Sequence, residues 1–407
     1  MTEVHSAPLI SQESDRGVDL ESSDLGMQES SDQHMNNKMT QSATQRFSES
    51  VSDRLSDRQS DSLSERQSGT LRERRSAWPE GVCTATAHAN IALIKYWGKK
   101  DASLRLPTAD SVSMTVDGLY TTTRVRILPR GNEFSFSLDG MQIQGPAADR
   151  VHRYVQKLQN RFGVHGPIAV ESANHVPTSA GLASSSSAFA ALALAFAGAY
   201  NLQVDRRELS RMARLGSGSA CRSIYGGFAR WHAGYDDETS YAVPIDEHPN
   251  LDLRLVVVEV DTGPKPIGST EAMDRVVKTS PYYDRWVEQT RRDNEEMLEA
   301  IADRDFSHIG RLAQQNALDM HALNLTARPG FTYIQAGTLK AMRIVRDLNA
   351  EGVECYFTLD AGANLKILTR SSMTSMVRTR FAEEMPQATV ATFGFGRAAH
   401  FGGNENN

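Results

Sequence analysis

The chain has 407 residues, with 44 Lys and Arg against 50 Asp and Glu, and its length allows roughly two or three domains. Residues 1–78 hold 14 acids and 9 bases, whereas residues 79–407 hold 36 and 35, so the net charge of -6 lies mainly in the N-terminal segment. A body this near to neutrality, without a basic stripe, excludes a nucleic-acid-binding protein that works by neutralising phosphates. No apolar run approaches the ~20 residues of a membrane span. Cys83, Cys221 and Cys355 lie far apart, which excludes a disulfide scaffold or zinc ribbon and favours a reducing cytoplasm.

Residues 1–78 form a serine-rich extension with 17 serines and only 11 Leu, Ile, Val or Phe. That apolar content is too low for a packed core, so we predict a disordered tail without chemistry. The alternatives are an interaction or phosphorylated segment, and a helix with Leu55 and Leu63 on one face. A targeting peptide is not indicated, because secretory signals need an apolar core and transit peptides avoid acids.

From Val82 onward the pattern changes to a mixture of strands and helices. A helix is predicted over 147–162, a long Ala-rich helix follows the loop at 177–187, and residues 269–350 are mainly helical. Residues 82–97 are predicted to form a strand followed by a loop. Further strands are predicted, in chain order, at 111–116, 120–128, 133–138, 168–172, 227–231, 253–260, 356–360, 365–370 and 388–393. Because the order lacks regular βαβ alternation, we expect an α+β fold in two lobes, 79–247 and 248–407.

The loop Pro177–Ser187 follows a strand, contains Gly181, and places four serines where the Ala-rich helix must begin. The free N–H groups and the dipole of a helix N-terminus suit a phosphate. Ordinary serine capping is the alternative, but a cap needs only one serine. The loop therefore predicts a phosphate site, although its spacing is not that of a Walker A loop.

Lys95 lies at the end of an apolar run that follows Asn90, where burial of an ammonium group is costly unless it meets an anion. The pattern alone fits equally well a lysine that extends to the surface while Tyr96 and Trp97 fill the core. An anion-binding lysine and a structural one both stay open at this point.

Two further segments carry polar groups beside small residues. In Gly216–Arg222, small residues allow a ligand to approach, and Arg222 offers a planar fork for carboxylate or phosphate, although a structural arginine is the more common case. Cys221 has no partner placed beside it by sequence and is predicted to be an inert thiol. In Leu359–Asn364, Asp360 is either a turn former or a general base near a hydroxyl. The histidines show no zinc-ligand spacing, and residues 394–399 match GxGxxA with no helix to follow, so neither predicts a site.

Taken together, these segments resemble a known family. PTSAGLASSSSA is similar to the phosphate loop of the GHMP kinase superfamily. NIALIKYWGKKD, LPTADSVSMTV, GSGSACRSIYGGF and LDAGAN, in that order, resemble the mevalonate diphosphate decarboxylase family over about residues 80–400. The resemblance implies a two-lobed GHMP-kinase-like fold, with an N-terminal lobe like domain 2 of ribosomal protein S5 and a ferredoxin-like C-terminal lobe.

The resemblance also implies the activity, which is ATP-dependent decarboxylation of 5-diphosphomevalonate to isopentenyl diphosphate. Asp360 and Lys95 match the catalytic aspartate and lysine, and Arg222 matches the arginine that holds the substrate carboxylate. The other matches are the substrate-pocket positions Asn90, Tyr96, Lys99, Ser217, Ser219 and Ser269, and the ATP phosphate-loop positions Gly181, Leu182, Ala183, Ser184 and Ser185. Mg²⁺ is expected to arrive with ATP rather than in a protein cage, and a homodimer is expected.

The chain departs from the family at Ala363 and His88, where proline is usual. Alanine at 363 releases a fixed φ, so the loop that carries Asp360 is expected to be looser. Three rivals stay open: a decarboxylase of 5-phosphomevalonate, a mevalonate 3-kinase without decarboxylation, and a non-catalytic binding protein that uses the tail for partners.

Overall fold

The computed structural model describes residues 81–175, 185–261, 263 and 265–402, so the tail predicted over 1–78 lies outside it. Within these residues the first lobe is built on an eight-stranded sheet in the order β14-β1-β4-β7-β5-β6, with β8 beside β4 and β9 beside β8. β5 and β7 are parallel, and the other pairs are antiparallel. Its strands are β1 (Val82–Ile94), β4 (Ser111–Ile127), β5 (Ser135–Leu138), β6 (Met141–Gln142), β7 (Ile168–His175), β8 (Phe228–Trp231), β9 (Ala242–Asp246) and β14 (His400–Phe401).

β4 is one strand of 17 residues, where the sequence predicts two separate strands at 111–116 and 120–128. Both halves pair with β1, but the register shifts between His88 and Asn90 of that strand. The extra residues on β4 include Gly118, whose φ of 66° most other residues adopt only at a cost. The prediction of two strands was therefore wrong because a bulge joins them.

The Ala-rich helix α4 (Ser185–Ala199) packs against β1 and β4 and is buried along nearly its whole length. Small side chains, among them Ala85 and Ala87 of β1, let the helix approach the sheet closely. A Cβ placed on Gly198 would come within 2.2 Å of Cys83 Sγ, so this helix position has no room for a larger residue. The remaining helices of the lobe are α3 (Pro146–Phe162), α5 (Arg206–Gly216) and the 3-10 helix η2 (Gly218–Ile224).

The second lobe contains a four-stranded antiparallel sheet in the order β11-β12-β10-β13. Along β10, Val256 and Val258 face one core, whereas Leu255 and Val257 face another, as strand alternation requires. The strands are β10 (Arg254–Glu259), β11 (Cys355–Thr358), β12 (Leu365–Thr369) and β13 (Thr389–Phe393). The helices are α6 (Ser269–Thr279), α7 (Tyr283–Ala302), α8 (Phe306–Thr326), α9 (Ala336–Ala350) and α10 (Thr374–Glu384).

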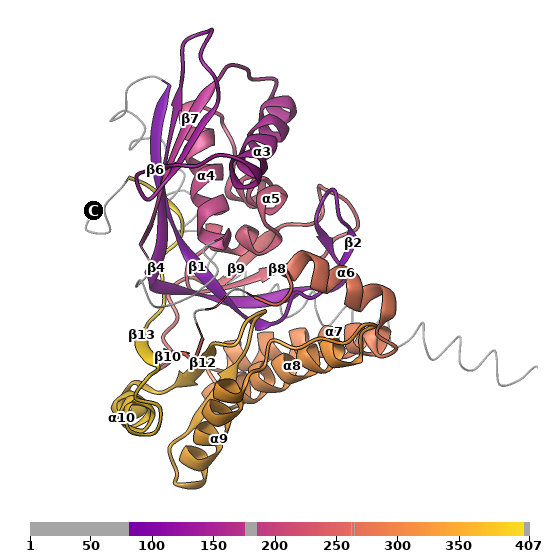
Figure 1. Cartoon of the computed structure of the whole chain (residues 1–407), viewed down its shortest axis with the longest axis vertical. Coiled ribbons are helices and arrows are strands. Elements are labelled where there is room, and N and C mark those ends of the chain that lie inside the picture. Colours follow the sequence, from indigo (N-terminus) through magenta and orange to yellow (C-terminus); the bar gives the residue numbers. More distant parts are fainter. Residues whose placement is uncertain (1–80, 176–184, 262, 264, 403–407) are drawn as a thin grey trace, which may run out of the picture. The chain divides into compact units, whose positions relative to one another are not determined.

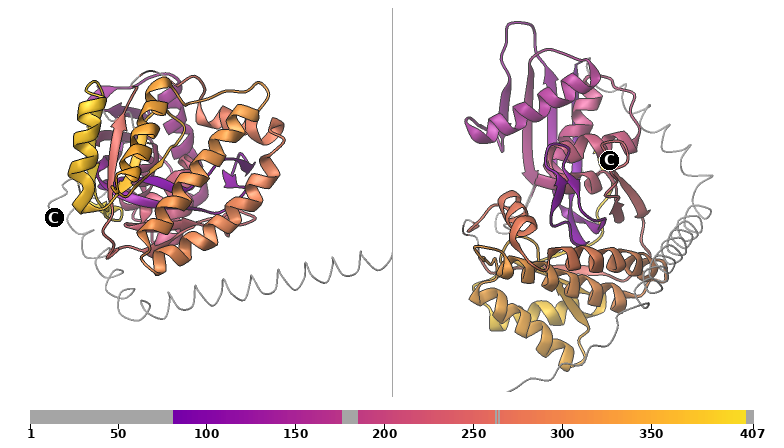
Figure 2. Two further views of the ribbon diagram at one scale, coloured as in Figure 1. Left: turned by 90° about the horizontal axis from the view of Figure 1, so that it is seen from below. Right: turned by 90° about the vertical axis from the view of Figure 1, so that its right-hand side faces the viewer.

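The two lobes share a hydrophobic core. One cluster of buried residues joins Leu93 and Met114 of the first sheet to Leu255, Met297 and Phe306 of the second lobe. α8 contacts both β1 and β11, and in Figures 1 and 2 the orange helices α7 and α8 lie between the indigo strands and α9. The predicted two-lobed α+β fold is confirmed, and the shared core fixes the end of β1 against the second lobe.

Among the described residues, no helix is both long enough and apolar enough to cross a membrane. A two-stranded ribbon of β2 (Lys99–Asp101) and β3 (Leu106–Pro107) follows the end of β1. It contacts α6 of the second lobe.

Candidate active site

A lysine and an aspartate 265 positions apart in the sequence meet where β1 and β11 end. Lys95 directly follows β1, and its Nζ donates hydrogen bonds to Asp360 Oδ1 and to Ala92 O, each at 2.8 Å. The Lys95 side chain is only 2% exposed, whereas the Asp360 side chain is 37% exposed. The buried partner of the pair therefore supports a carboxylate that a ligand can reach. Lys95 therefore does not extend to the surface, which was one of the two alternatives that the sequence left open.

Asp360 has a second cation that sequence reasoning missed. Lys366 Nζ, on the central strand β12, lies 3.0 Å from Asp360 Oδ2, and its side chain is 5% exposed. A signal for it exists in the sequence, because a lysine inside the buried run Leu365–Leu368 must meet an anion.

The two ammonium groups set the ionisation of the site. Burial alone would raise the pKa of Asp360, but Lys366 and Lys95, by charge and hydrogen bonding, hold that pKa well below its usual range. Burial lowers the pKa of Lys95 to about 8, against the opposing charge of Asp360. Asp360 is consequently a carboxylate at every physiological pH and a weak base before a ligand binds.

Arg222 lies buried in η2 and is 1% exposed. Its Nε donates to Ser113 Oγ at 2.9 Å, its Nη2 donates to Asn90 Oδ1 at 3.2 Å, and its Nη1 bonds to Ser111. Asn90 Nδ2 in turn donates to Ser219 O at 2.9 Å. The fold thus gathers Asn90, Arg222 and Ser219, three of the predicted site residues, into one hydrogen-bonded network.

Tyr96 and Lys99 present polar atoms that lack hydrogen-bond partners. Tyr96 Oη and Lys99 Nζ are both buried without one, although Lys99 Nζ lies 3.9 Å from Asp274 Oδ1 of α6. Burial lowers the pKa of Lys99. Unsatisfied buried donors are costly unless a ligand accepts their hydrogen bonds, and an anion suits both. A Cβ on Gly218 would come within 2.9 Å of the Tyr96 ring, so position 218 has no room for a side chain.

The remaining predicted residues are placed less completely. Ser217 precedes η2 and is 9% exposed, next to the loop that packs on Tyr96. Ser269 is exposed at the first position of α6, five residues before Asp274. Ser185 begins α4, while the predicted phosphate-loop residues Gly181, Leu182, Ala183 and Ser184 lie outside the described residues.

The sequence analysis singled out neither of two buried titratable groups in the second lobe, of which His321 lies beside the site. His321 of α8 is 2% exposed and lies close to the backbone of Asp360. Burial and the charge of Lys95 lower the pKa of His321 to about 4, so the ring is neutral at pH 7. Glu259, at the end of β10, is 5% exposed with neither carboxylate oxygen hydrogen-bonded. Burial raises the pKa of Glu259.

No cluster of three or more His, Cys, Asp or Glu side chains suited to a metal ion occurs in the described part of the chain. Cys83, Cys221 and Cys355 are buried free thiols. Burial raises the pKa of Cys221 to about 12, in keeping with an inert thiol.

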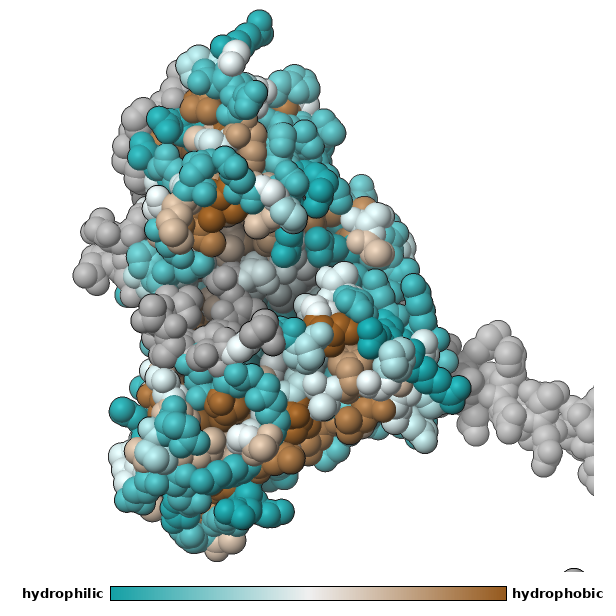
Figure 3. Space-filling model, viewed as in Figure 1, coloured by the Kyte–Doolittle hydropathy of each residue, from teal (hydrophilic) through white to brown (hydrophobic). Residues whose placement is uncertain are grey.

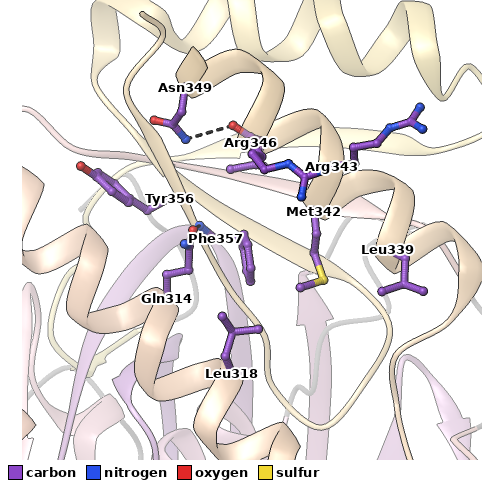
Figure 4. Close-up of a pocket in the computed structure, with 10 residues that line it drawn as sticks. Gln314, Leu318, Leu339, Met342, Arg343, Arg346, Asn349, Tyr356 and Phe357 are labelled. Carbon is purple, nitrogen blue, oxygen red and sulfur yellow. Dashed lines mark hydrogen bonds between the residues drawn. The ribbon is translucent and has the colours of Figure 1, made fainter. Parts of the chain in front are cut away.

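A separate pocket of about 520 Å³ opens between α8, α9 and β11 and contains none of the predicted site residues. Leu318, Met342 and Phe357 point toward one another there, as Figure 4 shows. Apolar side chains gather over α8 and α9 in Figure 3. Its lining includes Arg343 and Arg346 but no carboxylate or lysine, so it lacks the paired charges of the Lys95–Asp360 site.

Two families of known domains match this chain. The diphosphomevalonate decarboxylase-like N-terminal domain matches residues 87–242, and the mevalonate 5-diphosphate decarboxylase C-terminal domain matches residues 255–400. A relative from Candida albicans called diphosphomevalonate decarboxylase is 35% identical over 70% of this chain and 83% of its own. A relative from Haloferax volcanii called phosphomevalonate decarboxylase is 31% identical over 74% of this chain and 92% of its own.

The fold also matches solved structures. The structure of MDDEF in complex with MVAPP, AMPPCP and magnesium superposes with a TM-score of 0.76 at 38% identity. The match covers 79% of this chain and 99% of that chain.

Proposed function

The chain belongs to the diphosphomevalonate decarboxylase family, and on that premise we propose that it catalyses ATP-dependent decarboxylation of (R)-5-diphosphomevalonate. The products are isopentenyl diphosphate, ADP, phosphate and carbon dioxide. The observation that carries the proposal is the partly exposed Asp360 carboxylate, which buried Lys95 holds. The guanidinium of Arg222 is close enough to contribute to the lowering of the Lys95 pKa. Such a centre suits a substrate with several anionic groups and one hydroxyl.

In the first step, the C3 hydroxyl oxygen of the substrate attacks the γ-phosphorus of ATP, the bond from that phosphorus to the β–γ bridging oxygen breaks, and ADP leaves. Because phosphoryl transfer depends on positioning and charge, we assign Asp360 to orient the hydroxyl and to take its proton as the new bond forms. Lys95 donates two hydrogen bonds within the protein, to Asp360 and Ala92 O, which leaves one N–H for the transferring phosphoryl group.

In the second step, the C3–O bond breaks and phosphate leaves, so positive charge develops at C3. The electron pair of the bond between the carboxylate carbon and C2 forms the C2–C3 double bond and releases carbon dioxide. Arg222 holds the substrate carboxylate before this step, and the Asn90 amide fixes the guanidinium through its hydrogen bond.

The 5-diphosphate is assigned to the pocket of Tyr96, Lys99, Ser217, Ser219 and Ser269. The support for this assignment is the buried Tyr96 Oη and Lys99 Nζ, which lack hydrogen-bond partners among the residues that the structure describes. ATP is assigned to the loop from Gly181 to Ser185, with Mg²⁺ held mainly by its phosphates, as is usual for this hard cation. The complex of MDDEF with AMPPCP and magnesium supports the binding of ATP and Mg²⁺, although not the choice of loop.

The domain limits, assembly and location complete the proposal. The lobes are assigned to 79–247 and 248–407, which the gap between the matched segments ending at 242 and beginning at 255 supports. The protein is proposed to be a cytoplasmic homodimer, and its three cysteines, all buried free thiols, support a reducing compartment.

A decarboxylase of 5-phosphomevalonate is the second candidate, favoured by the Haloferax volcanii relative at 31% identity over 92% of that protein. A coupled assay of ADP and carbon dioxide with both phosphorylated mevalonates separates the two. The proposal expects a higher kcat/KM for the diphosphate, and a higher value for the monophosphate would replace it with the second candidate. ADP release without carbon dioxide would instead establish a kinase.

A further inference from the structure

We propose that Lys366 is a positioning residue for this reaction: its ammonium group holds one oxygen of Asp360, so that the other faces Lys95 and the reacting hydroxyl in a fixed orientation. The inference rests on the proposed function. It adds to the site a residue from the middle of the second sheet.

The fold leaves Lys366 no other anionic partner at hydrogen-bond distance among the described residues. On β12 it pairs with Val257 of β10 and with Thr358 of β11, so strands flank it on both sides. Leu365 and Ile367 point into the core beneath α9, which turns Lys366 to the opposite face, toward the first lobe. A buried ammonium in this setting is tolerated only when paired.

Two lysines share the carboxylate in a defined way. Lys95 Nζ lies 2.8 Å from Oδ1, and Lys366 Nζ lies 3.0 Å from Oδ2. With only Lys95, the carboxylate has one tether and rotates about its Cβ–Cγ bond. With both, its plane is fixed, which is the precondition for orienting a hydroxyl oxygen toward phosphorus. This matters more because Ala363 replaces a rigid proline in the same loop.

The groups around the pair determine its pH dependence. Charged or titratable groups that act on Asp360 and Lys366 are Lys95 after β1, Arg222 of η2 and neutral His321 of α8. Lys265 faces them from the segment before α6, since its Cε would lie 3.8 Å from a Cβ placed on Gly362. Lys366 lowers the pKa of Lys95 by charge repulsion. Removing Lys366 must therefore raise the pKa values of both Asp360 and Lys95.

A purely structural role predicts something different. If Lys366 only stabilised the second sheet, its replacement would lower the melting temperature, while the folded fraction would keep the wild-type kcat and pH profile. A positioning role changes kcat and the pH profile of the molecules that do fold.

The test compares Lys366→Met and Lys366→Arg with the wild-type enzyme, and uses Lys340→Met on the exposed face of α9 as the matched control. We expect Lys366→Met to lower kcat by about 10- to 100-fold, with KM changed much less, because the lost contact acts on the reacting groups. Lys366→Arg is expected to recover part of this loss, and Lys340→Met to match the wild type.

The pH profile supplies the second measurement. In Lys366→Met the basic limb of kcat/KM is expected to move to higher pH. Unchanged kcat and an unmoved basic limb in folded Lys366→Met would overturn the proposal. If that variant does not fold, Lys366→Arg and Lys366→Gln decide, and equal kcat in the two would overturn it. A wild-type enzyme that turns over neither phosphorylated mevalonate would instead contradict the proposed function, which distinguishes the two failures.

Discussion

At the scale of single residues, the site depends on one carboxylate shared between two buried ammonium groups. Burial of either lysine without an anionic partner would cost too much free energy. Together the two ammonium groups keep Asp360 ionised. A carboxylate that is strongly paired with cations binds a proton weakly. We therefore expect Asp360 to act first by orienting the hydroxyl and only then as a general base.

Replacing Asp360 with Asn keeps its size but removes the charge that the two lysines pair with. We expect kcat to fall by ~100-fold or more, by analogy with other positioned bases. The measurement is steady-state ADP and carbon dioxide release, with Asp347→Asn on an exposed helix surface as control. Near-wild-type turnover in folded Asp360→Asn would contradict the assignment.

The pKa of Lys95, lowered by burial to about 8, gives a pH prediction. As pH rises through that value, the free enzyme loses its ammonium group, so kcat/KM is expected to fall on the basic side near pH 8. Lys95→Arg keeps its charge throughout this range and should lack that limb, whatever its overall rate. A wild-type profile that stays flat to pH 10 would rule out an essential Lys95 ammonium.

At the scale of elements, α8 holds the end of β1 in place. Asn316, which is fully buried, accepts a hydrogen bond at 2.8 Å from the Lys95 backbone N–H. Its Nδ2 donates to Asp293 Oδ2 of α7 at 2.7 Å. Two helices of the second lobe thus position the backbone from which Lys95 projects.

Asn316→Ala is expected to cost about 1–3 kcal/mol of folding free energy, because it leaves the buried Lys95 N–H unsatisfied and removes the donor to Asp293 Oδ2. It should also lower kcat by roughly 10-fold through the displaced lysine. Chemical denaturation and turnover measure the two effects, and Gln315→Ala, exposed on the same helix, is the control. Loss of stability with unchanged kcat would show that α8 does not position Lys95.

At the scale of the whole molecule, the two lobes are joined by polar groups as well as by their shared core. Arg230 of β8 donates to Asp110 Oδ2 and to Glu295 Oε1 of α7, each at 2.8 Å. Asp110 also accepts from the Ala233 N–H at 2.8 Å. Burial opposes the ionisation of Asp110, but hydrogen bonding from His232 and the charge of Arg230 lower its pKa to about 2.

That shift determines how stability depends on pH. Because the folded-state pKa of Asp110 lies below the unfolded value, its contribution is complete above about pH 4 and is lost as pH falls toward 2. Asp110→Asn is therefore expected to cost about 2 kcal/mol near pH 7. The difference from wild type should shrink below pH 4 in urea titrations. A difference independent of pH would exclude the ionised carboxylate as its cause.

The sequence by itself determined the α+β class, the family and the order of Asn90, Lys95, Arg222 and Asp360 along the chain. Each of these residues lies in a short motif that is recognised from its neighbours in the sequence alone. The sequence did not distinguish an anion-binding Lys95 from a surface one. Lys366 was missed although a lysine within an apolar strand indicates a buried anion, because the sequence does not say which anion it meets. His321 was missed because an imidazole within a helix looks like ordinary core packing until its neighbours are known.

Only the tertiary structure decided that β1, β12 and α8 converge, because strand pairing and the shared core bring together residues separated by more than 200 positions. That convergence supplies the second lysine on Asp360. The chain encodes the chemical groups locally, but their distances, burial and charges follow from long-range packing.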